Sequence, residues 1–246
     1  MPEQGKQDHR IEAIKFLSSI FGHVDLHLLN QHWTLLPEKA ILWKNASTLL
    51  LSDLHLAKDS HFRKHGFAVP PQMSGQTLSR LSTLLDTLKP ERLLLLGDLF
   101  HSEANSGLDL FSKWRQDFRS LSMVLVAGNH DILDRQWYHD QHLEVHDVLQ
   151  EGPFTFQHEP QEDAASYQVC GHLHPAVRIS GNARQSLRFP CFWIGQHQTV
   201  LPSFGEFTGS KTIRFKKADR VVAIAEGELF LVNGGLNSAK GLPGSE

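Results

Sequence analysis

The feature that most constrains this chain is a run of four leucines at residues 93–96, followed by Gly97 and Asp98. A short, wholly apolar run bounded by glycine is typical of a strand that is buried on both faces inside a sheet. A carboxylate directly after such a strand lies at its carboxyl end, which is where open α/β sheets bind ligands. We therefore expect residues 93–96 to form a central strand and Asp98 to belong to a functional site.

Three further apolar runs end in the same way. They are residues 48–52 before Asp53 and His55, residues 124–127 before Asn129 and His130, and residues 167–170 before His172 and His174. If the four strands are neighbours in one sheet, the side chains that follow them converge at one edge. Asp, Asn and His without a thiolate suit a divalent cation such as Mn, Fe, Zn or Mg. The sequence therefore predicts a metal site assembled from distant parts of the chain.

The residue types also indicate a chemistry. Asp53 and His55 point to the same side if the backbone there is extended, and the carboxylate on the most central strand, Asp98, is the natural bridge between two cations. Such a pair polarises a shared water to supply hydroxide and neutralises phosphoryl oxygens. We expect hydrolysis of a phosphoester, with His130 donating a proton to the leaving oxygen.

The remaining pattern predicts an α/β (α+β) fold. Apolar residues at helical spacing predict helices over residues 74–88 and 108–121, each leading into a site strand in the βαβ rhythm of a parallel sheet. The last third is rich in short strands, including a hairpin over residues 221–232 that turns at Glu226 and Gly227. A mixed two-sheet β-sandwich flanked by helices accommodates both parts. We expect an N-terminal arm at 1–22, a single domain at 23–233 and a disordered tail at 234–246.

Bulk properties narrow the class of protein. The 246 residues carry a formal net charge of −3, so nucleic-acid binding would require a local basic patch or a metal ion. The 16 histidines are suggestive of metal ligation, while the two cysteines fit no metal or redox spacing and favour a reducing compartment. The polar N-terminus lacks the apolar core of a signal peptide, and no run approaches the length of a membrane span. We expect a cytoplasmic protein that does not enter a membrane.

Two other segments carry candidate residues. The basic connection at 56–71 follows His55 and ends in two prolines, so it can pass over the site, with Arg63 facing an anionic substrate. The alternative for this connection is a solvated loop. His139, His142 and His146 would share spacing on a helix, where an exposed polar face is a more ordinary explanation than metal ligation.

The four strand endings resemble the motifs of a known family. In order they read Asp53-x-His55, Gly97-Asp98-x-x-His101, Gly128-Asn129-His130-Asp131 and Gly171-His172-x-His174. This order, within residues 48–175, resembles the calcineurin-like metallophosphoesterases, and four ordered motifs are far more specific than a lone glycine pattern. The resemblance implies a dinuclear site in which one metal would be held by Asp53, His55, Asp98 and His174, and the other by Asp98, Asn129, His158 and His172.

One motif departs from the family pattern. Many members have an aspartate where this chain has His101, and in the protein phosphatases that aspartate orients the histidine corresponding to His130. The departure disfavours a protein phosphatase. Family members with nuclease activity on DNA ends resemble this chain at residues 97–101, which makes His101 a candidate second catalytic or phosphate-contacting histidine.

A narrower resemblance is to the bacterial ligase-associated DNA-damage-response endonucleases, the PdeM-like group. This resemblance rests on the segments 52–56, 61–64 and 68–70, and on the later run Leu201-Pro202-Ser203-Phe204-Gly205. The resemblance implies nucleic acid as the partner, and the name of the group, rather than any residue, suggests a relation to a DNA ligase and a helicase in repair. The sequence does not indicate an oligomeric state.

The leading hypothesis is thus a phosphodiesterase with two divalent ions, Mn being the first candidate, that acts as a nuclease through a metal-bridged hydroxide. A second hypothesis is a phosphodiesterase or phosphatase for a small nucleotide or other phosphoester, which the slightly acidic net charge favours. A third is a non-catalytic subunit of a repair complex. Against the third stands the presence of every expected ligand type.

Overall fold

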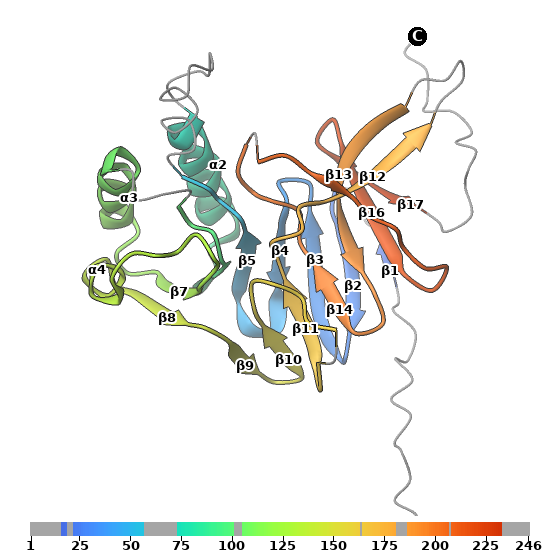
Figure 1. The fold of residues 1–246 in the computed structure, drawn as a ribbon, viewed down its shortest axis with the longest axis horizontal. Helices are drawn as coiled ribbons and strands as arrows, with labels where there is room; N and C mark the ends of the chain where they lie inside the picture. The colour runs from blue at the N-terminus through green and yellow to red at the C-terminus, as the bar shows by residue number, and fades with distance from the viewer. Residues whose placement is uncertain are drawn as a thin grey trace, which may run out of the picture.

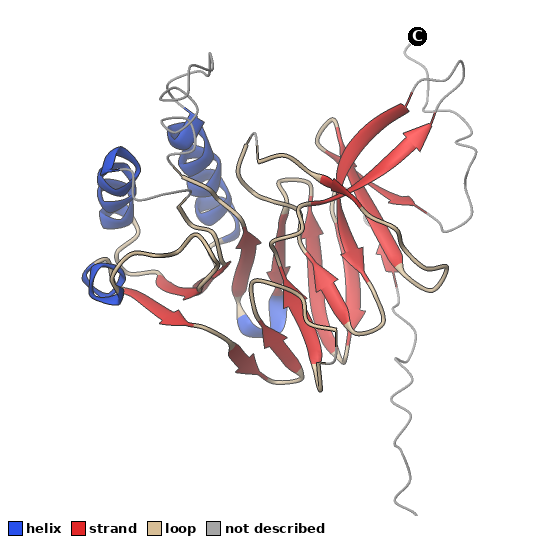
Figure 2. Cartoon of the chain, viewed as in Figure 1, coloured by secondary structure: helices blue, strands red, loops and turns tan. Residues whose placement is uncertain are grey.

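Two β-sheets face each other, and helices cover the outer face of the first (Figure 1). The computed structural model describes residues 16–18, 22–56, 73–100, 105–162, 164–180, 186–206 and 208–232. In the described part of the chain, strands dominate both halves, while the three α-helices there lie together on one side (Figure 2). The predicted fold class, a mixed two-sheet sandwich with flanking helices, is confirmed.

The first sheet has eight strands in the order β1-β2-β3-β4-β5-β6-β7-β8. They are β1 (Phe16–Ser18), β2 (Val24–Leu28), β3 (Gln31–Leu36), β4 (Ala40–Trp43), β5 (Thr48–Ser52), β6 (Arg92–Leu96), β7 (Ser122–Val126) and β8 (Leu143–His146). Strands β1 to β5 are antiparallel neighbours, whereas β5 to β8 are parallel. Strand β1 comes from the predicted N-terminal arm and pairs with β2 at the edge of the sheet.

The second sheet has nine strands, of which seven follow the order β15-β12-β13-β14-β11-β10-β9, while β16 pairs with β13 and β17. They are β9 (Leu149–Glu151), β10 (Phe154–Phe156), β11 (Tyr167–Cys170), β12 (Pro175–Ser180), β13 (Ser186–Ile194), β14 (Gln198–Val200), β15 (Lys211–Thr212), β16 (Arg220–Ala225) and β17 (Glu228–Val232). The predicted hairpin is confirmed: Ala225 pairs with Glu228, and the two turn residues between them have positive φ angles of 51° and 76°.

The helices are α2 (Met73–Leu88), α3 (Asn105–Asp117) and α4 (Arg135–Asp140), with a 3₁₀ turn η1 (Lys44–Ala46). Helix α3 ends four residues before the predicted end at Leu121. The buried guanidinium of Arg115 donates hydrogen bonds to the carbonyls of Phe118 and Leu121, and these bonds stabilise a turn there instead of another helical turn. None of the described helices is long and apolar enough to cross a membrane.

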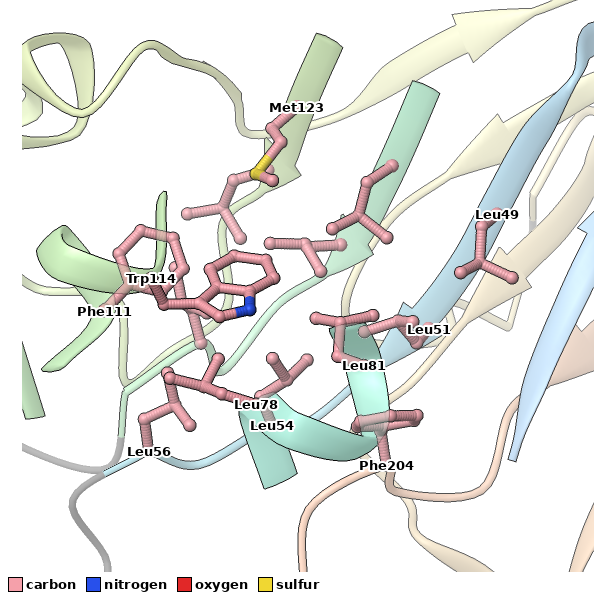
Figure 3. Packing of buried hydrophobic residues seen from close by; sticks show 14 of the residues in the cluster. Leu49, Leu51, Leu54, Leu56, Leu78, Leu81, Phe111, Trp114, Met123 and Phe204 are labelled. Atoms are coloured by element: carbon pink, nitrogen blue, oxygen red, sulfur yellow. The ribbon is translucent and has the colours of Figure 1, made fainter. Parts of the chain in front are cut away.

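The leucine run explains why the sheet is packed on both sides. Leu93 and Leu95 belong to the core between the sheet and the helices, while Leu94 and Leu96 belong to the core between the two sheets. Successive side chains of a strand point to opposite faces, so four leucines in a row fit only a strand that is covered twice. Figure 3 shows the helix-side core, where Leu51 lies beside Leu81 of α2. The position of β6 between β5 and β7 is as predicted.

Candidate metal centre

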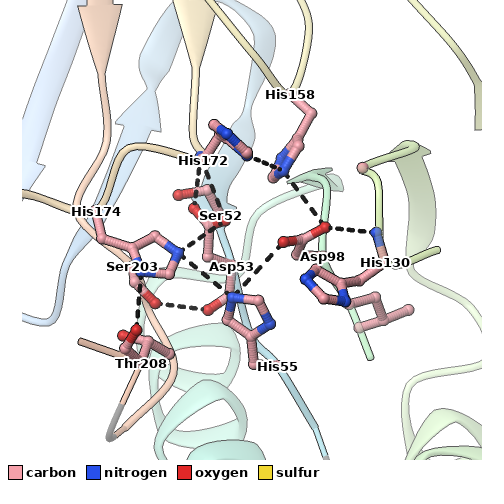
Figure 4. A network of polar contacts seen from close by, with 12 residues as sticks. Ser52, Asp53, His55, Asp98, His130, His158, His172, His174, Ser203 and Thr208 are labelled. Atoms are coloured by element: carbon pink, nitrogen blue, oxygen red, sulfur yellow. Dashed lines mark hydrogen bonds and ion pairs between the residues drawn. The ribbon is translucent and has the colours of Figure 1, made fainter. Parts of the chain in front are cut away.

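The site lies where the carboxyl ends of strands from both sheets meet. Strands β5, β6 and β7 are parallel neighbours, and Asp53, Asp98 and Asn129 follow their ends. The four strands do not all lie in one sheet, because β11 belongs to the second sheet. Strand β11 pairs with β10 in parallel, so His158 and His172 reach the same place from the opposite side (Figure 4).

A first cluster contains Asp53, His55 and His174, each of which offers one ligand atom within 4.8 Å of the others. The Nε2 atom of His174 is 3.2 Å from Oδ1 of Asp53 and 3.3 Å from Nε2 of His55. The other nitrogen of His174 lies 3.2 Å from the carbonyl oxygen of Thr208. A hydrogen bond of this kind orients a histidine so that its second nitrogen is available to a ligand.

A second cluster contains Asp53, Asp98 and His158, again with ligand atoms within 4.8 Å of one another. Nε2 of His158 is 3.4 Å from Oδ1 of Asp98 and 3.1 Å from Nδ1 of His172. The Nδ1 atom of His158 lies 3.0 Å from the carbonyl oxygen of Leu96, at the end of the leucine run. That contact orients Nε2 of His158 into the site.

The two clusters share a carboxylate. Asp53 belongs to both, while Asp98 also lies 3.7 Å from Nε2 of His55, a member of the first. Both carboxylates are therefore between the two sets of imidazoles, and the backbone N–H of His172 points to the carboxylate of Asp53 at 3.1 and 3.3 Å. The assignment of the bridge to Asp98 stays a prediction.

The backbone at the candidate ligands is left-handed. The φ angles are 54° at Asp53, 47° at His55, 52° at Asp98, 64° at His172 and 44° at His174. The condition of extended backbone at Asp53 and His55 is therefore not met, although both side chains reach the first cluster. Non-glycine residues in this region cost roughly 1–3 kcal/mol each where the conformation is strained, and such residues cluster at functional sites.

Hydrogen bonds from neighbouring loops hold this backbone. The N–H of Asp53 donates to the carbonyl of Gly97 at 3.1 Å, and the N–H of His55 donates to that of Asp98 at 2.9 Å. The carbonyl of Asp53 accepts from the hydroxyl of Ser203 at 2.8 Å and from the N–H of Gly205 at 3.0 Å. The loop at 202–205 supports the site, a role that its residue types alone did not indicate.

The motif glycines make room for candidate ligands that come from other parts of the chain. A Cβ atom on Gly97 would lie 2.1 Å from Nδ1 of His158, and one on Gly128 would lie 2.4 Å from Oδ1 of Asp98. A Cβ atom on Gly171 would lie 2.6 Å from Oδ2 of Asp53. Each glycine therefore permits the close approach of a candidate ligand that is distant in sequence.

The electrostatics follow from burial and pairing. Burial raises the pKa of Asp98, but the hydrogen bond and charge of His158, the backbone N–H of His130 and the charge of His55 outweigh it and lower the pKa to about 2. Burial lowers the pKa of His158, yet its contacts with Asp98, Asp53 and the Leu96 carbonyl raise it to about 9. Without an ion, the imidazolium of His158 balances the carboxylates.

Asp131 joins two of the motif loops. Its carboxylate accepts hydrogen bonds from the N–H groups of Leu99 and Gly128, both at 2.9 Å. Burial raises the pKa of Asp131 to about 6, against the backbone hydrogen bond from Gly128 and together with the charge of Asp98. The sequence places this aspartate next to the His130 motif, but only the structure reveals that it fastens the loops after β6 and β7 to each other.

The donor set fits divalent cations. Two carboxylates that are 0% and 3% exposed lie among imidazole nitrogens at 3.2–3.7 Å. Two pairs of imidazole nitrogens face each other at 3.1 and 3.3 Å. Ligand atoms about 2.0–2.2 Å from one ion come this close to one another, and carboxylate oxygen with imidazole nitrogen suits Mn, Fe or Zn.

The other predicted site residues lie as follows. Asn129 is exposed, and the ring centroid of the partly buried His130 lies 5.6 Å from that of His55. His101 and Arg63 fall outside the described residues. The three histidines at 139, 142 and 146 do not share a helix: they occupy α4, the turn after it and β8, respectively. They form neither of the two clusters of candidate ligands.

Comparison with known proteins identifies the class. Residues 46–241 match the calcineurin-like phosphoesterase family, and this matched range includes all four motifs and both clusters. The chain belongs to this family and is therefore a phosphoester hydrolase by class.

Among solved structures, the chain is similar to the nuclease MPE of Pseudomonas putida, with 32% identity and a TM-score of 0.73 over 85% of this chain and 100% of that one. Weaker matches are a protein of unknown function, AQ665, from Aquifex aeolicus (19% identity, TM-score 0.35, 51% of this chain and 77% of that one) and YfcE, a phosphoesterase from E. coli. The latter has 13% identity and a TM-score of 0.39 over 78% of this chain and 94% of that one. No curated protein matches the sequence.

Proposed function

We propose that this protein is a nuclease, a phosphodiesterase that uses two divalent metal ions, Mn being the first candidate. The observation that carries the proposal is the pair of clusters around Asp53 and Asp98, whose ligand atoms lie within 4.8 Å inside each cluster. Similarity over 85% of the chain to a protein described as a nuclease supports the choice of nucleic acid over a small phosphoester.

The residues divide the work as follows. Asp53, His55, Asp98 and His174 would hold one ion, and Asp98, Asn129, His158 and His172 the other. When bound, such ions acidify water and neutralise phosphoryl oxygens. The chain itself fixes the ligands before any ion arrives: His158 and His174 donate hydrogen bonds to the carbonyls of Leu96 and Thr208, and the hydroxyl of Ser203 donates to the carbonyl of Asp53.

His130 is the proposed proton donor to the leaving oxygen. Its backbone N–H donates to Oδ1 of Asp98 at 3.1 Å, which fixes the main chain beside the candidate bridge. Its ring is partly buried and lies edge-on to that of His55, so it borders the site without being one of the clustered ligands. A histidine so placed can donate a proton to a leaving group. His101 and Arg63 remain proposed contacts for the phosphate.

Turnover of defined substrates tests the proposal. The Mn-loaded protein should hydrolyse bis(p-nitrophenyl) phosphate in preference to the monoester, and it should cleave single-stranded or duplex DNA. Turnover of the small diester without cleavage of DNA would instead favour an enzyme for small nucleotides. No turnover with Mn, Fe, Zn or Mg would overturn the proposal and favour a non-catalytic subunit.

Two variants separate the roles. Asp98→Ala should abolish turnover and lower metal content, since the carboxylate lies in the centre of the site, whereas the exposed Asp109→Ala should change neither. His130→Ala should keep the metal content and reduce turnover by roughly 10²–10⁴-fold, with His139→Ala on α4 as its matched control. Loss of metal from the His130 variant would make this residue a ligand.

The resemblance to the ligase-associated group extends the proposal to cytoplasmic DNA repair, with a DNA ligase and a helicase as partners. Copurification of the tagged chain with the ligase and helicase of its own cell tests this part separately. Recovery of neither, before and after DNA damage, would speak against it without bearing on the metal chemistry.

A further inference from the structure

The chain has an uneven distribution of charge. Residues 175–220 contain eight Lys or Arg and two Asp or Glu, a net charge of +6, although the whole chain carries −3. The rest of the chain therefore has a net charge of −9. The positive segment runs from β12 through β15 and the following loop to Arg220, the first residue of β16, and it begins directly after the candidate ligand His174.

Three arginines of this segment share one face of the sheet. Arg178 of β12 and Arg188 of β13 are directly opposite each other in the antiparallel pair, and both are exposed. Thr212 of β15 pairs with Ala176, which lies on the same face of β12 as Arg178. From Thr212 to Lys216 exposed and partly buried residues alternate, so the exposed Arg214 shares the face of Thr212. We call Arg178, Arg188 and Arg214 the arginine face.

The other face of these strands is apolar. Val177, Ile179, Phe189, Ile213 and Phe215 belong to a separate core cluster. This packing fixes the register and directs the three arginines away from the core. The orientation of the arginines therefore follows from the alternation of side chains along each strand rather than from chance contacts on the surface.

The arginines are not neutralised by the protein. Like charges directly opposite each other destabilise an antiparallel pair, and the Arg178–Arg188 pair has that arrangement. Arg188 donates one hydrogen bond, to the carbonyl of Ser210 at 3.3 Å. Within the described part of the chain, no ion pair joins any of the three to a carboxylate. A polyanion bound on this face would supply the missing negative charge.

The position of the arginine face relative to the metal centre indicates which polyanion. Arg178 is four residues beyond His174, which corresponds to about 13 Å along an extended strand. One DNA strand rises 3.4 Å per nucleotide, so this span is about four nucleotides. In Figure 1, β12 and β13 extend away from the end of β5, on the side of the molecule opposite α3 and α4.

We infer that the arginine face binds the phosphate backbone of DNA a few nucleotides from the phosphodiester at the metal centre. This inference rests on the proposed nuclease function and assigns the substrate a direction across the molecule. Contacts of arginine with phosphate position the backbone without reading sequence. The face would therefore raise affinity for DNA and leave the hydrolysis of a small diester unchanged.

The test compares two triple variants with the same change in net charge. Arg178→Gln, Arg188→Gln and Arg214→Gln together remove the arginine face. Lys113→Gln, Arg119→Gln and Arg135→Gln remove three exposed positive charges from the region of α3 and α4 and serve as the control. Binding of phosphorothioate duplex DNA to the Mn-loaded full chain is measured against salt concentration, along with turnover of bis(p-nitrophenyl) phosphate and the melting temperature.

The arginine-face variant should bind DNA at least about tenfold more weakly. The slope of log affinity against log salt should become less steep by about 2 to 3, because each lost phosphate contact accounts for about 0.9. The control should keep the slope, and both should keep turnover of the small diester. The inference would be overturned by an unchanged slope in the arginine-face variant or by an equal loss of DNA affinity in the control. It would also be overturned if turnover of the small diester fell in parallel, or if poly-L-glutamate competed for the protein as effectively as DNA does.

The outcome is separable from that of the proposed function. A wild-type protein that hydrolyses the small diester but does not bind DNA would refute the arginine face and leave a phosphodiesterase. A wild-type protein that binds DNA through these arginines but hydrolyses neither substrate would refute the nuclease and leave the docking face.

Discussion

Gly171→Ala is the most direct test of how the metal centre is built. The Cβ atom that this change adds would lie 2.6 Å from Oδ2 of Asp53, 2.6 Å from Cβ of Ser52 and 3.0 Å from the carbonyl oxygen of Leu96. Ordinary contacts begin at 3.4 Å. Gly171 has no positive φ angle, so alanine is compatible with the backbone and the effect comes from crowding.

The size of the expected effect on metal binding and turnover depends on which of these neighbouring atoms can move. Ser52 and Leu96 belong to the paired strands β5 and β6, and both are held by the sheet. Cβ of Ser52 cannot yield, so the loop at residue 171 must shift, and the carboxylate of Asp53 must also move by roughly 1 Å. A misplacement of that size near the chemistry can cost about 10²-fold in rate. Overpacking of a core typically costs about 1–3 kcal/mol in the free energy of unfolding. We expect Mn affinity to fall by about tenfold or more and turnover by about 10²-fold.

Metal titration by calorimetry, turnover of bis(p-nitrophenyl) phosphate and thermal unfolding measure the three effects. Gly75→Ala in α2 is the matched control, because its Cβ meets nothing within 4 Å. There alanine should stabilise the helix by up to about 1 kcal/mol and leave the metal centre unchanged. If the Gly171 variant binds Mn and turns over within twofold of the wild type, the view that this glycine clears space for Asp53 is refuted.

Two further predictions concern the core and the protonation of the site. Leu94→Ala, a change in the core between the two sheets, should lower the free energy of unfolding by about 2–5 kcal/mol, whereas Leu231→Ala, 44% exposed, should cost much less; similar losses in denaturant titrations would contradict the assigned packing. In the metal-free protein, the raised pKa of His158 stabilises the fold below pH 6.5, and this contribution is lost as the pH rises through about 9. NMR titration should show its imidazole protonated at pH 7.5, and Zn should release that proton; a ring already neutral at pH 7.5 would refute the pairing with Asp98.

Much of the fold was accessible from sequence because its central signal is local. Four leucines bounded by glycine indicate a strand covered on both faces, and the helical spacing of apolar residues indicates α2, whose predicted range of 74–88 differs from the structure by one residue. The hairpin at Glu226 and Gly227 follows from turn chemistry. The end of α3 was less accessible, because carbonyls bound by Arg115 decide it.

The histidines show the limit of spacing arguments. Helical spacing placed His139, His142 and His146 on one face, but the chain leaves the helix at residue 140 and enters a strand at 143. His158, in contrast, stands outside any dense motif, and its neighbours in sequence give little reason to select it. Its place in the site depends on the parallel pairing of β10 with β11 and on the space left by Gly97.

By itself, the sequence determined which residues form the central strands and which polar side chains follow them, since strand burial and strand endings depend on neighbours in the chain. Only the tertiary structure decided that His172 and His174 follow a strand of the second sheet, and that candidate ligands adopt a left-handed backbone conformation. It also decided which glycine clears space for which ligand. The physical reason is that these properties arise from contacts between segments that are distant in the sequence, from Asp98 with Gly128 to Asp53 with His172, and no local pattern encodes them.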